Sequence, residues 1–86
     1  MVCSCCNKKK RLFDMFYSVE EGKVTLCGEC WDVVERLESD MAGGEKELYD
    51  IHLFQLKKRA KNPSEEFLTW QRTHFPSAES VNEFGR

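Results

Sequence analysis

The five cysteines of this chain all lie within its first 30 residues, and four of them form two Cys-x2-Cys pairs. The first pair is Cys3 and Cys6, and the second pair, separated from it by 20 residues, is Cys27 and Cys30. Two residues between thiolates allow a tight knuckle in which both sulfurs reach one metal ion, so two knuckles complete a tetrahedron. Because four thiolates leave no open position for water or substrate, the sequence predicts one structural Zn2+ ion rather than a catalytic site.

The fifth cysteine and the identity of the metal leave alternatives open. Cys5 could replace Cys3 or Cys6 as a ligand, or it could be a spare thiol beside the metal. The x2 spacing favours the spare thiol. Iron is the alternative metal, since rubredoxin-like and iron–sulfur sites also take four cysteines. An odd cysteine count argues against a disulfide framework, so we expect a reducing, cytoplasmic compartment.

A hairpin and a helix must position these cysteines. Residues 12–19 are rich in aromatic and β-prone side chains, and the residues alternating on one face are Phe13, Met15, Tyr17 and Val19. A turn at 20–23 and a returning strand at 24–26 complete the hairpin. From residue 28 to residue 41 the apolar period becomes helical, and one side of the helix carries Cys30, Trp31, Val33, Val34, Leu37 and Met41. The sequence Ala42-Gly43-Gly44 ends this helix.

The order of the predicted elements resembles that of treble-clef zinc fingers. A cysteine knuckle comes first, a hairpin follows, and the second cysteine pair lies at the start of a helix. The resemblance covers residues 3–41 and rests on two motifs, Cys3-Ser4-Cys5-Cys6-Asn7-Lys8 and Leu26-Cys27-Gly28-Glu29-Cys30-Trp31. It implies four zinc ligands, namely Cys3, Cys6, Cys27 and Cys30. The residue after the first pair is often glycine in such folds, and Asn7 is the next best residue for a left-handed backbone. The superfamily includes nucleic-acid binders, adaptors and parts of enzymes, so the resemblance specifies fold better than function.

The second half of the chain is predicted to be helical. A helix over about 45–61 carries Ile51 and Phe54 roughly opposite an apolar stripe made of Tyr49, Leu53, Leu56 and Ala60. Both sides must be covered, either by neighbouring elements or by another chain. A third helix is predicted over 63–75, with Asn62 as its N-cap, and it stops at Pro76. Residues 77–86 could add a short helical turn or could fray.

These elements predict a small zinc-stabilised α+β fold. Residues 1–42 form a treble-clef-like zinc-binding module, and residues 45–86 form a helical extension packed on it as one cooperative unit. With 86 residues, the chain is too short for two independent cores. We expect the extension to pack on the first helix, and the side chains that we expect in this contact are Trp31, Val34, Leu37, Phe67, Trp70 and Phe75.

We expect no enzyme. Cys27-Gly28-Glu29-Cys30 also resembles the Cys-Gly-x-Cys of thiol oxidoreductases, which makes a thiol redox protein a minor alternative, but that family needs a βαβ context. His52 and His74 could bind a metal only if a cysteine dropped out. We expect His74 to pack in the core and His52 to lie at the border of the apolar stripe.

Two basic runs are candidates for contacts with phosphates. Lys8, Lys9, Lys10 and Arg11 follow the first knuckle, where they could bind nucleic acid or offset the charge of thiolates on zinc. Lys57, Lys58 and Arg59 end the second helix, where cations complement its dipole. The chain has 13 Lys plus Arg against 15 Asp plus Glu, a net charge of -2 that disfavours a uniformly basic nucleic-acid binder.

We therefore expect a small intracellular adaptor, regulator or inhibitor that binds a protein partner, with nucleic-acid binding as the alternative. The candidate partner-binding residues are Ile51, Phe54 and Trp70. A homodimer through the second helix is also open. No apolar run approaches the roughly 20 residues of a membrane span and no signal peptide is evident, so no membrane partner is expected.

Overall fold

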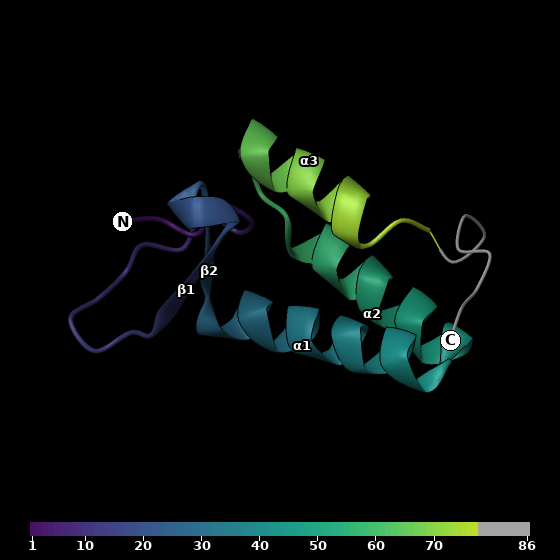
Figure 1. The fold of residues 1–86 in the computed structure, drawn as a ribbon. Coiled ribbons are helices and arrows are strands. Elements are labelled where there is room, and N and C mark those ends of the chain that lie inside the picture. Colours follow the sequence, from purple (N-terminus) through teal and green to yellow (C-terminus); the bar gives the residue numbers. More distant parts are fainter. Residues whose placement is uncertain (78–86) are drawn as a thin grey trace.

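The computed structural model describes residues 1–77, which form a two-stranded antiparallel hairpin and three helices (Figure 1). This confirms the small α+β fold. The strands are β1 (Phe16–Val19) and β2 (Val24–Cys27), and the helices are α1 (Gly28–Gly43), α2 (Lys46–Arg59) and α3 (Glu65–His74). The helical turn predicted at 77–86 lies, from residue 78 on, outside the described residues. None of the described helices has the length and apolar character needed to cross a membrane.

The hairpin is shorter than predicted. Phe16 pairs with Cys27 and Val19 pairs with Val24 across a single 3-10 turn at Glu20–Gly22, which confirms the predicted turn. β2 has four residues and ends where α1 begins, so the residues before Phe16 have no strand to pair with. Phe13 and Met15, predicted on one alternating face of a strand, are therefore exposed in the loop before β1.

Helix α1 follows β2 without a connecting loop and runs to a left-handed C-cap. The Gly44 backbone has φ +71°, and its N–H faces the carbonyls of Asp40 and Met41. Glycine adopts this conformation without the steric cost of a Cβ atom. One side of α1 is buried along its length, which confirms the predicted helix and its apolar side.

Helix α2 turns back and packs along α1 (Figure 1). Its predicted stripe is confirmed, because Tyr49, Leu53 and Leu56 are buried. The opposite side is not covered by the described residues, since Ile51 is 53% exposed and Phe54 is 65% exposed. Within residues 1–77, burial of α2 on both sides, one of the two sequence alternatives, is therefore not observed.

Helix α3 begins later than predicted and lies against β2. Ser64 is the N-cap, and its Oγ accepts the Phe67 backbone N–H at 3.1 Å. Asn62, the predicted N-cap, has φ +49° and lies before the helix, so that assignment is wrong. The expected anchors Phe67, Trp70 and Phe75 are buried. The principal element contact of α3 is with β2 rather than with α1.

Candidate metal centre

The four cysteines of the two pairs converge in the fold. The Sγ atoms of Cys3, Cys6, Cys27 and Cys30 all lie within 4.8 Å of one another. A tetrahedral site with metal–sulfur bonds of about 2.3 Å has edges of about 3.8 Å, and the Sγ atoms of Cys6 and Cys27 are 3.7 Å apart. The four thiols that the sequence singled out could therefore hold one metal ion.

The first pair lies in a tight turn of the backbone. The Cys6 N–H points at the Cys3 Sγ at 3.5 Å, and the Asn7 N–H donates to the Cys3 carbonyl at 3.0 Å. Asn7 has φ +67°, which confirms the left-handed backbone predicted there. The Cys3 N–H returns to the Lys8 carbonyl at 2.9 Å and closes the turn. These hydrogen bonds within the turn bring Cys3 and Cys6 to one side of it.

The second pair straddles the start of α1. Cys27 is the last residue of β2 and the N-cap of α1, and Cys30 lies in the first turn of that helix. The N-terminal end of a helix dipole favours negative charge, which would suit thiolates once a metal ion is bound there. The hairpin and α1 meet at Cys27, so a metal ion bound to the second pair would fix the angle between the hairpin and α1.

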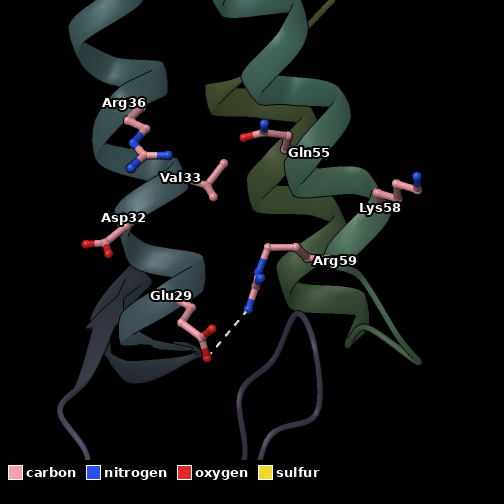
Figure 2. Close-up of a pocket in the computed structure, with 7 residues that line it drawn as sticks. All are labelled: Glu29, Asp32, Val33, Arg36, Gln55, Lys58 and Arg59. Carbon is pink, nitrogen blue, oxygen red and sulfur yellow. Dashed lines mark ion pairs between the residues drawn. The ribbon is translucent and has the colours of Figure 1, made fainter.

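Arg59, at the end of α2, contacts the cluster directly. Its Nε donates to the Cys30 Sγ at 3.3 Å, and this hydrogen bond raises the pKa of the guanidinium above its usual value. Figure 2 shows Arg59 reaching across from α2 to Glu29 on α1, with a nitrogen–oxygen distance of 4.0 Å. Four thiolates around a divalent ion carry a net negative charge, which a neighbouring cation offsets. The sequence assigned Arg59 only to the helix dipole, because no spacing rule links residue 59 to residue 30.

Without a metal ion, the surroundings of the cluster favour the protonated form of the Cys3 thiol. A hydrogen bond with the Cys30 thiol, together with burial, raises the pKa of the Cys3 thiol to about 12. A metal ion binds the thiolate form, so binding at neutral pH must release thiol protons.

Cys5 lies beside the cluster but is not one of its four members. It is fully buried, and its thiol points at the Leu56 carbonyl of α2 at 3.8 Å. Of the two sequence alternatives, this position favours the spare thiol. Its role in the fold is to pack the first knuckle against α2.

The backbone of the first knuckle also joins the two halves of the chain, a role that the sequence did not indicate. The Ser4 N–H donates to the Thr25 carbonyl at 2.6 Å, and the Thr25 N–H donates to the Ser4 Oγ at 3.0 Å. On the other side, the Lys61 N–H donates to the Cys5 carbonyl at 2.8 Å and the Ser64 N–H donates to the Ser4 carbonyl at 3.0 Å. The knuckle is therefore hydrogen-bonded to β2 and to the connection between α2 and α3.

Neither histidine belongs to the cluster. His52 is half-buried at the border of the α2 stripe, as predicted, and its Nδ1 lies 2.5 Å from the buried Asp40 carboxylate. His74 is exposed, so the prediction that it packs in the core is wrong. It is the last residue of α3, and the centre of its ring lies 5.3 Å from the centre of the Trp70 ring.

The other candidate residues are distributed over separate surfaces. Lys8 to Arg11 are exposed in the loop before β1, where the Lys8 Nζ lies 3.6 Å from a Glu29 oxygen. Ile51 and Phe54 are exposed on α2, whereas Trp70 is only 5% exposed. Trp70 therefore belongs to the core and offers no surface to a partner.

No protein-family model matches the chain, and neither a curated protein nor a solved structure matches it. Four of the chain's cysteines lie close enough together to hold a metal ion.

Proposed function

We propose that this chain is a non-enzymatic interaction module in which one structural zinc ion, held by Cys3, Cys6, Cys27 and Cys30, stabilises a treble-clef-like unit. The observation that carries the proposal is the convergence of the four Sγ atoms to within 4.8 Å. Four thiolates complete a tetrahedral zinc site and exclude substrate, as in structural rather than catalytic centres. The left-handed backbone at Asn7 and the position of Cys27 at the start of α1 support the same arrangement.

The surface proposed for a protein partner is the outer face of α2. Leu48, Ile51 and Phe54 follow one another at helical spacing, and all three are exposed. A helix that leaves apolar side chains exposed along one face is a common docking surface for a second protein. Lys58 lies 5.7 Å from the centre of the Phe54 ring and forms the basic end of this face.

Native mass spectrometry of the protein purified without added metal tests the zinc site. We expect one zinc ion per chain, lost on acidification, since protonated thiols do not bind the metal. A folded chain that carries iron, or that carries no metal, would contradict the zinc assignment. The same spectrum gives the oligomeric state and so tests a homodimer through α2.

The partner surface is tested by affinity capture from the cells that produce the chain, with two double variants compared. We expect Ile51→Ser with Phe54→Ser to abolish capture of a protein, and Lys9→Gln with Lys10→Gln to leave it intact. Loss of capture in the lysine variant, together with sensitivity to nuclease, would favour nucleic-acid binding instead.

A further inference from the structure

The loop before β1, residues 8–15, presents large apolar side chains to solvent. Leu12 is 83% exposed, Phe13 is 89% exposed and Met15 is 67% exposed. Figure 1 shows this loop projecting away from the three helices, between the first knuckle and β1. Surface apolar residues are common one at a time, but a cluster of this size on a projecting loop indicates a binding site.

Hydrogen bonds within the loop hold its tip in place. The Arg11 N–H donates to an Asp14 carboxylate oxygen at 2.9 Å, and the Asp14 N–H donates to the Arg11 carbonyl at 3.2 Å. These bonds close a turn whose two central residues are Leu12 and Phe13. At the base of the loop, Lys9 forms a β-bridge with Val2. Leu12 and Phe13 are therefore at the outermost point of an ordered turn.

Four consecutive cations lead into this tip. Lys8, Lys9, Lys10 and Arg11 are all exposed, and Lys8 alone of the four is within ion-pair distance of a carboxylate among residues 1–77. The one acidic side chain in the loop, Asp14, accepts a backbone hydrogen bond from Arg11. The loop thus combines an apolar tip with a basic flank, although the whole chain has a net charge of -2.

We propose that the 8–15 loop binds the surface of an anionic lipid bilayer, with Leu12 and Phe13 inserted among the lipids and the basic run against the headgroups. Leu12 and Phe13 are 83% and 89% exposed, and a fluid bilayer can close around such side chains whereas a flat protein surface covers only one side of them. Stable surface binding takes an apolar anchor together with basic residues, and both are present here. The sequence expectation of no membrane partner rests on the lack of a membrane-spanning segment, which binding to a bilayer surface does not require.

Co-sedimentation of the metal-loaded protein with vesicles tests this proposal. The vesicles contain phosphatidylcholine alone or phosphatidylcholine with phosphatidylserine. We expect binding to the phosphatidylserine vesicles and a decrease of roughly tenfold or more in binding when Leu12 and Phe13 are changed to Ser or when Lys9, Lys10 and Arg11 are changed to Gln. The matched control is Ile51→Ser with Phe54→Ser, which removes exposed apolar side chains from α2 and should leave vesicle binding unchanged.

Insertion has a separate readout. In Phe13→Trp, we expect the added indole fluorescence to be quenched by brominated lipid, while the fluorescence of Trp31 and Trp70 is not. Vesicle binding that is insensitive to the Leu12 and Phe13 changes would overturn insertion. If the metal-loaded chain does not bind phosphatidylserine vesicles, the proposal is overturned, and a pocket on a protein would be the expected partner of the loop instead. Measuring the metal content of each variant keeps these outcomes separate from a failure of the zinc site.

Discussion

The hairpin region, residues 1–27, and the helical region, residues 28–77, bury different kinds of side chain. In the hairpin region three of the five buried apolar residues are cysteines, and the other two are Val24 and Leu26. In the helical region the buried residues are mainly large aliphatic and aromatic side chains, including Leu37, Tyr49 and Phe67. Two buried aliphatic residues cannot stabilise a fold of this length, so the hairpin region needs a metal or the rest of the chain.

This difference indicates that the two regions are stabilised by different interactions. Structural zinc in small fingers supplies about 10–16 kcal/mol of apparent binding energy, which is the source of stability that we propose for the hairpin region. Packing of α2 along α1 supplies stability to the helical region through the burial of apolar surface. The first knuckle connects the two regions, because its backbone is hydrogen-bonded to β2 and to the segment between α2 and α3.

The largest effect should come from removing one thiolate. Cys27→Ser is expected to lose the metal and to unfold the hairpin region, because a site with three thiolates no longer supplies the binding energy on which that region depends. Metal content by native mass spectrometry and the dispersion of amide signals from residues 1–27 measure the two effects. The matched control is Cys5→Ala, which should keep one metal per chain. A metal-free Cys27→Ser chain with a folded hairpin would remove the distinction between the regions.

A cavity in the helical region should cost less and should leave the metal bound. Leu37 is fully buried on α1, and Leu37→Ala is expected to lower the free energy of unfolding by about 2–5 kcal/mol. Phe54→Ala, on the exposed side of α2, should change it by less than about 0.5 kcal/mol. Chemical denaturation of the metal-loaded proteins gives both values. Loss of metal from folded Leu37→Ala would show that the helices, rather than the thiolates alone, determine the site.

The connection between the two regions can be weakened at Asn7. Two features of this residue contribute separately to stability: its left-handed backbone, and the hydrogen bond of 2.8 Å from its side chain to the Lys61 carbonyl. Asn7→Gly removes only the hydrogen bond and should cost about 1 kcal/mol. Asn7→Ala also strains the left-handed backbone, so it should lower the free energy of unfolding by about 1–2 kcal/mol more. Equal losses in the two variants, measured by denaturation, would mean that the backbone conformation is not what stabilises the connection.

The smallest effect is expected at the start of α3. Ser64→Ala removes the N-cap hydrogen bond and should lower the free energy of unfolding by about 1 kcal/mol. Asn62→Gly should be nearly neutral, because glycine accepts the positive φ at that position. The reverse order of effects in thermal denaturation would return the cap to Asn62, where the sequence pattern alone placed it.

Local sequence patterns predicted most of the elements and the composition of the candidate site. Neighbouring residues alone indicated four features: the two cysteine pairs, the left-handed backbone at Asn7, the helix that starts at Gly28 and the buried stripe of α2. These features follow from spacing, helical period or the conformation of one residue, which are properties of a short stretch of chain. The predicted limits of β1 and the predicted N-cap of α3 were less accurate, because several adjacent residues satisfy the same local rules.

Other features depend on contacts that no short stretch contains. Arg59 reaches Cys30 because α2 folds back along α1, and Ser4 meets Thr25 and Ser64 because the knuckle lies between β2 and α3. Phe13 has the alternation of a core residue, yet it is exposed because β2 is too short to pair with the residues before Phe16. Short stretches of sequence therefore specify which thiols could bind a metal and which segments are helical. Which charge lies beside the thiols, and which apolar side chains remain exposed, follows from tertiary contacts, because both depend on the distance between residues far apart in the chain.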